Sequence, residues 1–234
     1  MEEVILKVSN LTKIYDKKNR GVFDISFEVK KNEFHAFIGE NGAGKTTTIK
    51  SIIGAYTNFK GEILIENISN LEAKSKFKIG YVPENAVFPK ELSAYEYLKS
   101  LALLSGVKKH LIKTKIEAML EKFNILDLKN QKPYAFSSGQ KKKILLIQAL
   151  IHEPELIILD EPAANLDPTA RYELFETLKE LINEGKTIFI SSHILSEIDQ
   201  YTNALTIIHQ GKILYTGKKT KSLNDIFYEK VIKN

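Results

Sequence analysis

The stretch Gly39-Glu40-Asn41-Gly42-Ala43-Gly44-Lys45-Thr46-Thr47 decides the fold of this chain. Its spacing is Gly-x-x-x-x-Gly-Lys-Thr, which is typical of a loop whose backbone N–H groups surround phosphate oxygens. In such a loop Lys45 reaches the β- and γ-phosphates, and the Thr46 hydroxyl belongs to the shell of a Mg²⁺ ion. A glycine-rich turn with a stray lysine is the alternative, and this pattern arises by chance in roughly 1% of chains of this length. The stretch therefore predicts a nucleoside triphosphate site formed by its residues.

The residues on either side of this loop support the prediction. Glu33 to Ile38 is a short apolar segment that predicts a buried strand entering the loop, and Thr47 to Ile53 predicts a helix leaving it. The N-terminus of such a helix carries a partial positive charge, which favours a bound anion.

A second motif predicts a carboxylate pair at a strand end. Leu156 to Leu159 is a continuous apolar run, as in a strand buried on both faces, and Asp160-Glu161 follows it. Ligands of open α/β sheets bind at the carboxyl ends of the strands. Asp160 is expected to hold Mg²⁺, directly or through water, and Glu161 to polarise the attacking water as the catalytic base. The alternative is an acidic pair that caps the strand before a helix.

With these motifs the chain resembles the ATP-binding subunit of an ABC transporter over nearly its whole length. The resemblance implies ATP and Mg²⁺ as cofactors and ATP hydrolysis as the activity. It also implies an α/β fold: a P-loop NTPase, RecA-like core with an N-terminal antiparallel β-subdomain and an inserted helical subdomain. In one ABC ATPase domain, the β-subdomain and core would comprise 1–88 and 153–217, the helical subdomain with its signature loop 89–152, and a short tail 218–234.

The family's signature loop, usually Leu-Ser-Gly-Gly-Gln, corresponds to Phe136-Ser137-Ser138-Gly139-Gln140. Phe136 replaces the leucine and Ser138 replaces the first glycine. The resemblance implies a sandwich dimer, formed with a second copy or a homologous subunit, in which the signature loop of one subunit faces the γ-phosphate held by the other. The loop's Ser137, Ser138, Gly139 and Gln140 are thus expected to act in trans.

Three further segments match the family. Tyr15 lies where the family places an aromatic ring that stacks on adenine, although packing is an equally good explanation for a lone tyrosine. Ala164-Asn165-Leu166-Asp167 resembles the loop that touches the partner subunit. His193, after the apolar strand Thr187 to Ser191, resembles the switch histidine at the γ-phosphate. The resemblance thus implies a catalytic set of Lys45, Glu161 and His193.

The strand Ile79 to Val82 is followed by Pro83-Glu84, where many relatives have a glutamine. Glu84 is expected to coordinate Mg²⁺ or its water and to couple the γ-phosphate to rotation of the helical subdomain. Sequences with Pro-Glu here resemble the ABC-2 and multidrug-type exporter branch, in which grooves beside this position receive short helices of separate membrane subunits. The alternative is an acid in a surface loop.

A helix is predicted from Ser138 to His152, with Ser137 as its N-cap. Lys141, Lys142 and Lys143 lie in its first turn, where cations oppose the helix dipole. A polyanion facing this N-terminus, as in the family's dimer, would offset the penalty. The alternative is a solvated basic face.

Apolar patterning predicts the remaining elements. Three β-rich segments suit an antiparallel subdomain: Val4 to Ser9, Phe23 to Val29 and Gly61 to Glu66. Helical spacing predicts three more helices: Ser93 to Leu104, Leu111 to Phe123 and Pro168 to Asn183. Two further strands are predicted before an amphipathic tail: Ala204 to His209 and Lys212 to Tyr215.

Composition restricts the partners and the setting. The chain has 234 residues and no cysteine, which excludes disulfides and thiolate metal sites. Its net charge of +5 is modest and its lysines lie among acidic neighbours, so no nucleic-acid partner is expected. The start Met1-Glu2-Glu3 lacks a signal peptide's basic region, and no apolar run approaches the ~18 residues that span a bilayer. We therefore expect a subunit at the cytoplasmic face of the membrane, held there by integral-membrane permease subunits.

Competing classes remain. A soluble ABC protein acting on ribosomes or DNA normally carries two ATPase domains or a long coiled-coil insertion. A small-molecule kinase with a P-loop would lack the signature loop and the switch histidine. A degenerate, non-catalytic subunit stays open because of Ser138 and Glu84.

Overall fold

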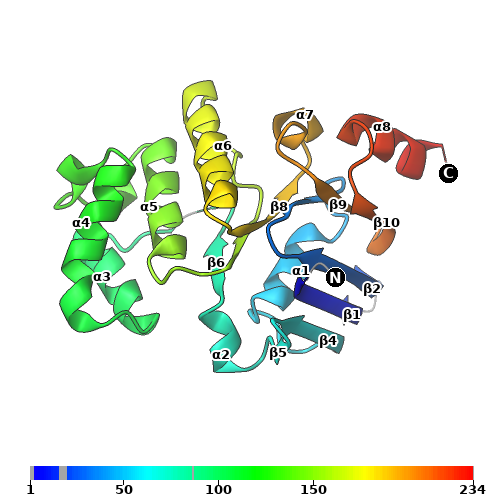
Figure 1. Ribbon diagram of the computed structural model, residues 1–234, viewed down its shortest axis with the longest axis horizontal. Coiled ribbons are helices and arrows are strands. Elements are labelled where there is room, and N and C mark those ends of the chain that lie inside the picture. Colours follow the sequence, from blue (N-terminus) through cyan, green and yellow to red (C-terminus); the bar gives the residue numbers. More distant parts are fainter. Residues whose placement is uncertain (1–2, 16–19, 86, 234) are drawn as a thin grey trace.

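The computed structural model describes residues 3–15, 20–85 and 87–233. Met1 and Glu2, part of the N-terminal start considered above, lie outside the described residues. The described residues form helices and two β-sheets. The part that is mostly helical lies at one end of the molecule (Figure 1).

The smaller sheet is antiparallel and has the strand order β2-β1-β4-β5. Its strands are β1 (Val4–Ile14), β2 (Gly21–Lys30), β4 (Lys60–Ile65) and β5 (Ile68–Ser69). The strand predicted to end at Ser9 continues to Ile14, because its pairing with β2 shifts register between Val8 and Leu11 instead of stopping. Asn10 in this bulge takes a left-handed backbone with φ of 51°, which asparagine tolerates better than most residues.

The larger sheet has the order β10-β9-β3-β8-β7-β6, and only its β10 edge pairs antiparallel. Its strands are β3 (Phe34–Ile38), β6 (Ile79–Val82), β7 (Leu156–Leu159), β8 (Thr187–Ser192), β9 (Ala204–His209) and β10 (Lys212–Lys218). The predicted bounds of β6, β7 and β9 agree with the structure, whereas β10 runs three residues beyond Tyr215.

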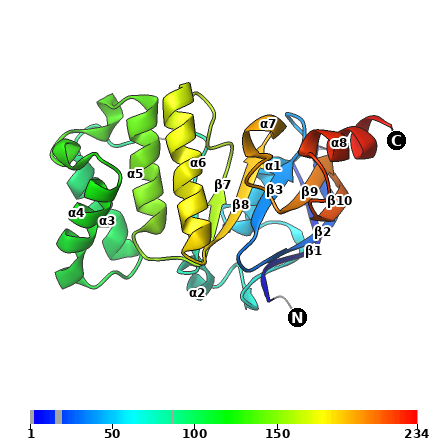
Figure 2. The ribbon, with the colours of Figure 1, turned by 45° about the horizontal axis from the view of Figure 1, so that its top comes forward.

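Four of the α-helices lie towards one end of the described chain, and the others are distributed around the two sheets (Figures 1 and 2). α3 (Ala94–Leu104), α4 (Ile112–Lys122) and α5 (Ser138–Leu150) pack together at one end, and α5 lies beside α6 (Pro168–Asn183) in both views (Figures 1 and 2). The others are α1 (Lys45–Ile52), α2 (Ala73–Lys76), α7 (Leu195–Ile198) and α8 (Leu223–Phe227). α6 has its predicted bounds, α1 begins two residues earlier than predicted, and α5 ends two residues earlier.

The core lies on both faces of the larger sheet, and β3 shows why. Phe34, Ala36 and Ile38 pack on the side of the helices, while Phe37 packs on the side of the smaller sheet. There the rings of Phe27, Phe37 and Phe189 stack with centroids 5.3 to 5.8 Å apart. An antiparallel β-subdomain on a RecA-like sheet with an inserted helical part is the predicted fold class, and it is confirmed.

The topology brings the carboxyl ends of the parallel strands to one edge. Leu159 of β7 is in register with Val82 of β6 on one side and Ile190 of β8 on the other, and Ile38 of β3 is in register with Ser192 of β8. The loops that follow these four strands therefore begin side by side, which places the predicted site residues at this edge.

Candidate active site

The phosphate loop is held tightly between the two sheets at two glycines. A Cβ on Gly39 would lie 2.3 Å from the carbonyl oxygen of Ile208, and a Cβ on Gly44 would lie 2.6 Å from a methyl carbon of Val22. Gly44 also has a φ of 113°, a left-handed backbone that directs the chain into α1. Both glycines are thus required where the loop packs against β9 and β2, a reason that the sequence did not indicate.

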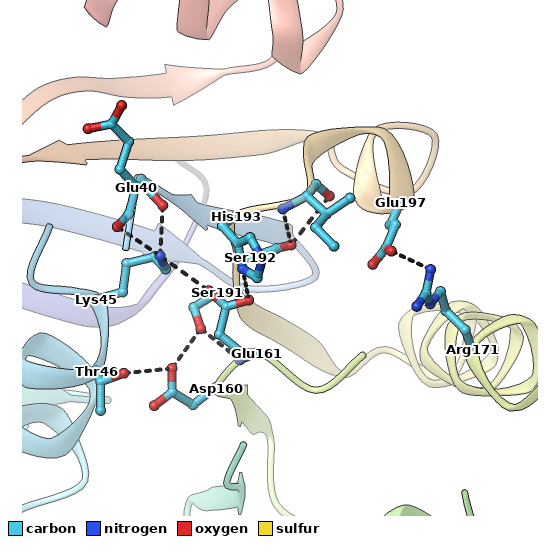
Figure 3. Close-up of polar contacts among 12 residues, drawn as sticks. Glu40, Lys45, Thr46, Asp160, Glu161, Arg171, Ser191, Ser192, His193 and Glu197 are labelled. Carbon is cyan, nitrogen blue, oxygen red and sulfur yellow. Dashed lines mark hydrogen bonds and ion pairs between the residues drawn. The ribbon is translucent and has the colours of Figure 1, made fainter. Parts of the chain in front are cut away.

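Lys45 is 6% exposed, and its ammonium group turns back into the loop. Its Nζ donates to the carbonyl oxygens of Gly39 at 2.7 Å and Glu40 at 3.2 Å. It also lies 3.2 Å from Glu161 Oε1, an ion-pair distance without the alignment of a hydrogen bond (Figure 3). The phosphate loop and the strand after which Glu161 lies are therefore joined by one buried cation.

Asp160 is the centre of a buried hydrogen-bond group. Its Oδ1 accepts from Ser191 Oγ at 2.8 Å and from Thr46 Oγ1 at 3.4 Å, and the Glu161 backbone N–H donates to Ser191 Oγ at 2.9 Å. Ser191 was not predicted as a site residue. The pairing of Leu159 with Ile190 puts the next residues, Asp160 and Ser191, beside each other, but that pairing is a property of the sheet.

The electrostatics of this edge favour a cation. Burial raises the pKa of Asp160, while hydrogen bonds from Ser191 and Thr46 oppose the rise and the charges of Glu161 and Glu84 add to it. Burial, with the charges of Asp160 and Glu84, raises the pKa of Tyr81 to about 12. Negative charge thus gathers where little water can solvate it.

The donor set fits Mg²⁺. Thr46 and Asp160 offer hydroxyl and carboxylate oxygens, the hard ligands that Mg²⁺ prefers, beside a loop built for phosphates. Within the described ranges no group of three or more His, Asp or Glu residues is arranged to hold a metal ion. Mg²⁺ sites in ATPases do not need such a cage, because waters and substrate phosphates complete the shell.

Glu161 lies between Lys45 and His193, the other two residues of the expected catalytic set. His193 Nδ1 is 2.8 Å from Glu161 Oε2, on the other side of the carboxylate from Lys45 (Figure 3). Since a carboxylate only accepts, Nδ1 carries the proton in this contact. Glu161 has a φ of 45°, a left-handed conformation that costs free energy in a non-glycine residue and occurs most often at functional sites.

These residues surround one cavity of about 290 Å³. It is lined by side chains and backbone from four segments: Asn41, Gly42, Gly44, Lys45, Thr46, Thr47, Glu84, Glu161, Ala164 and His193. The structure thus brings together the phosphate loop, the predicted base, the predicted switch histidine and Glu84.

Comparisons with known proteins agree with this geometry. Residues 22–164 match the family model described as "ABC transporter". The chain belongs to the ABC transporter ATP-binding family. It is an ATP-binding subunit of an ABC transporter, and an ATPase.

Relatives match most of the chain. A protein of Mycoplasma pneumoniae described as "Putative ABC transporter ATP-binding protein" is 50% identical over 95% of this chain and 69% of its own length. NatA of Bacillus subtilis is 32% identical over 93% of this chain and 94% of its own, and the linearmycin resistance ATP-binding protein LnrL of that organism is 36% identical over 92% and 70%. A solved ATP-binding subunit of an ABC transporter superposes with a TM-score of 0.86 at 31% identity, covering 96% of this chain and 98% of that one.

Tyr15 of this ABC ATPase lies beside the phosphate loop. Its hydroxyl donates to Thr47 Oγ1 at 2.9 Å, and its ring meets Tyr56 edge-on with centroids 5.8 Å apart. The residue is 49% exposed, so part of its ring is free to stack on a base. This placement is compatible with the predicted adenine contact, and Tyr56 is a neighbour that the sequence did not indicate.

In the signature loop, Ser137 and Gln140 form hydrogen bonds with each other within one turn. Ser137 caps α5 by accepting from the Gln140 backbone N–H at 3.3 Å, and Gln140 Oε1 accepts from the Ser137 N–H at 3.0 Å. A Cβ on Gly139 would lie 3.1 Å from the Cβ of Ala170 at the start of α6. The four signature residues all lie in the described part of the chain, and none of them lines the phosphate cavity.

The lysines after this loop differ from one another, and the alternative of a solvated basic face is wrong for Lys142. Lys142 is 6% exposed and donates to the carbonyl oxygens of Pro83 and Glu84, at 3.2 Å each. Lys143 pairs with Glu173 of α6 at 2.9 Å. The ammonium group of Lys142 is therefore bound by two carbonyl oxygens of its own chain and does not belong to a solvated face.

Arg171 of α6 is another contact that the sequence did not indicate. One guanidinium nitrogen lies 2.6 Å from Glu197 Oε1 on α7 (Figure 3). Another donates to the Leu166 carbonyl at 3.1 Å. Leu166 belongs to the predicted partner-contact loop, and Glu197 lies four residues after His193. Arg171 therefore holds that loop against the segment that carries the histidine.

No helix in the described ranges is long and apolar enough to cross a bilayer.

Proposed function

We propose that this ABC ATPase closes as a dimer around two MgATP molecules and that hydrolysis drives export of a substrate through separate integral-membrane subunits. The observation that carries the proposal is the position of Glu161, held between Lys45 and His193 at the cavity that the phosphate loop lines. A carboxylate so placed suits a catalytic base, because it faces the space where a γ-phosphate and a water would meet.

Each residue has a distinct proposed role. Thr46 and Asp160 hold Mg²⁺, with Glu84 joining the metal or its water. When bound, Mg²⁺ supplies Lewis-acid stabilisation of the charge on the transferred phosphoryl group. Glu161 accepts hydrogen bonds from the water and orients it, and Lys45 balances charge on the β- and γ-phosphates.

His193 has a proton requirement that follows from its contact. Its Nδ1 already donates to Glu161, so donation to a phosphate oxygen must come from Nε2. Only the imidazolium form donates from both nitrogens. A γ-phosphate therefore either meets a cationic His193 or exchanges for Glu161 as the acceptor, and both routes link the histidine to the state of the nucleotide.

The dimer is proposed because the signature loop of this chain does not line the chain's own phosphate cavity. Ser137, Ser138, Gly139 and Gln140 do not line the cavity that contains Lys45, so a second subunit, identical or homologous, is needed to bring a signature loop to the ATP. Tyr15 is proposed to stack on the adenine. The proposed subdomains keep the ranges 1–88 with 153–217, 89–152 and 218–234.

The proposals of export and of membrane partners are based on relatives of this chain. LnrL is by its name a linearmycin resistance protein. Pro83-Glu84 directly after β6 resembles the exporter branch. A solved relative, cbiO1 of Clostridium perfringens, 26% identical with a TM-score of 0.80 over 99% of this chain and 97% of that one, is described as part of the complex cbiONQ. We therefore propose attachment at the cytoplasmic face of the membrane through permease subunits, without nucleic acid. A soluble or degenerate ABC-type ATPase without transport is the competing function, and the assembled Lys45, Glu161 and His193 argue against degeneracy.

Reconstitution tests the proposal. We expect a gene for a six-helix membrane protein beside the gene of this chain. That protein is placed with the chain in proteoliposomes, and ATP turnover is measured with and without it. We expect stimulation of the parent, and we expect Glu84→Ala to keep ATP binding but to lose most of the stimulation. Glu121→Ala, an exposed acid on α4, is the control and should behave as the parent. Equal stimulation of Glu84→Ala and the parent would contradict the role of Glu84, and no stimulation of the parent would contradict the transport partner.

A further inference from the structure

Lys142 connects two segments of this ATPase that lie far apart in the sequence. It lies near the start of α5, five residues after the N-cap Ser137, and its ammonium reaches the loop that follows β6. There it donates to two consecutive carbonyl oxygens, those of Pro83 and Glu84, at 3.2 Å each. Two carbonyls held by one cation fix two successive peptide planes, and with them the direction in which the Glu84 side chain leaves the backbone.

The site of Lys142 is costly for a cation. Burial lowers the pKa of Lys142 to about 8, although the negative charges of Glu84 and Asp160 oppose this effect. Within the described residues no carboxylate oxygen forms an ion pair with its Nζ within 4 Å, so the carbonyls are its direct partners. An apolar side chain of similar length would fill this position without that cost, which indicates that the contact with the loop has another use.

We propose that Lys142 is a positioning residue that fixes Glu84 relative to the start of α5, so that the metal site and the signature loop move together. The inference rests on the proposed function, because Glu84 must act at the metal or its water for its position to matter. Glu84 lines the phosphate cavity, and α5 begins directly after Ser137. A shift of the loop on metal binding would thus pull on α5 through a single ammonium group.

A double-mutant cycle on the full chain tests whether Lys142 acts through Glu84. The variants are Lys142→Met, Glu84→Ala and both together, with Lys113→Met, an exposed lysine on α4, as the control. The first readout is Mg²⁺ titration of the protein with a fluorescent ATP analogue, and the second is kcat and KM for ATP. Lys142→Gln, which is too short to reach both carbonyls, repeats the test if Lys142→Met lowers the melting temperature.

We expect Lys142→Met to raise the Mg²⁺ concentration for half-saturation about tenfold and to lower kcat by a similar factor, as is usual for residues that orient metal ligands. Metal-free binding of the analogue and KM for ATP should stay within about twofold, because Lys45 and the phosphate loop are untouched. The double variant should be no worse than Glu84→Ala, since the two changes then remove one interaction.

Losses that multiply in the double variant would overturn the inference, and so would parental Mg²⁺ dependence in Lys142→Met. Asp160→Asn separates these outcomes from failure of the proposed function. If Asp160→Asn and Glu84→Ala both leave Mg²⁺ binding unchanged, the proposed metal site is wrong and the inference falls with it. If both weaken Mg²⁺ binding while Lys142→Met does not, the proposed function stands and only the role of Lys142 is overturned.

Discussion

Thr46 in the phosphate loop bonds to Asp160, 114 residues later in the chain, whereas Ser137 and Gln140 in the signature loop pair with each other, three residues apart. The first loop is held by contacts between distant segments, and its lysine also meets Glu161. The second is held by the local geometry of a helix start. One loop is therefore part of a site that this chain assembles by itself, while the other is a preformed surface.

This difference suits an ATPase whose two half-sites meet only in a dimer. Changes in the phosphate-loop half should alter ATP binding or chemistry in a single chain. Changes in the signature half should leave the single chain intact and appear only when two chains close. Mutations in the two regions are thus expected to differ in kind as well as in size.

The largest effect is expected at Glu161. Glu161→Gln keeps the size of the side chain but removes the negative charge that polarises water, so turnover should fall by about 10²- to 10⁴-fold while MgATP still binds. Because the proposed dimer opens after hydrolysis, the variant should accumulate as an ATP-bound dimer in gel filtration.

Glu121→Gln on the surface of α4 serves as the control for Glu161→Gln and should keep parental turnover. Near-parental turnover of Glu161→Gln would remove Glu161 as the base. A monomer in the presence of MgATP would count against closure around the nucleotide.

Substitution of Asp160 should have opposite effects on activity and on the stability of the ligand-free chain. Asp160→Asn weakens Mg²⁺ binding and should leave the chain monomeric with little turnover, unlike Glu161→Gln. Its ligand-free form, however, should melt at a higher temperature than the parent at pH 7.5. An asparagine oxygen can still accept from Ser191, and the change removes a charge that burial disfavours.

The expected gain in stability of Asp160→Asn should depend on pH. Burial raises the pKa of Asp160 in the folded chain above its unfolded value of 3.8, so the parent loses stability as pH rises through the folded pKa. The advantage of Asp160→Asn should therefore be full at neutral pH and shrink as pH falls towards the unfolded value. Scanning calorimetry from pH 7.5 to pH 4 measures it, and an advantage that grows on acidification would contradict this account.

The sequence predicted those features that depend on local pattern. The bounds of β6, β7, β9 and α6 follow from apolar runs and from Asp167-Pro168, an N-cap followed by proline in the first turn. That Lys45, Glu161 and His193 lie at one site was implied by the family resemblance, and the structure places the three side chains in contact.

Features that depend on neighbouring segments could not be predicted in this way. Ser191 bonds to Asp160 only because β7 pairs with β8. The sequence of neither strand determines which strand lies next to it in the sheet. Lys141, Lys142 and Lys143 are identical in the sequence, but the loop after β6 buries only the second of them. The partner of Arg171 on α7 is likewise set by how α6 packs.

A smaller effect, limited to the dimer, is expected at Ser138. Ser138→Gly gives this position the first glycine of the signature sequence Leu-Ser-Gly-Gly-Gln that the loop resembles, so it should change dimer-dependent turnover severalfold by altering the approach to the partner's γ-phosphate. ATP affinity of the monomer, measured at low protein concentration, should stay unchanged because Ser138 does not line the phosphate cavity. A severalfold shift in monomer affinity would show that Ser138 does not act across an interface.

The smallest effect comes from two serines that cap helices in the same way. Ser137 caps α5 and Ser93 caps α3, each in a capping box closed by the residue three positions later. Replacing either by alanine should lower the free energy of unfolding by about 1 kcal/mol, because one backbone N–H loses its acceptor. Urea denaturation should give similar losses for the two variants.

Turnover should distinguish them, since only Ser137 lies in the loop proposed to face a partner's γ-phosphate. Ser137→Ala should therefore lower kcat beyond any change in Ser93→Ala, at a protein concentration where the parent dimerises. Equal kcat values for the two variants would mean that the Ser137 hydroxyl serves α5 alone. The signature loop would then present its backbone, rather than this side chain, to the second subunit.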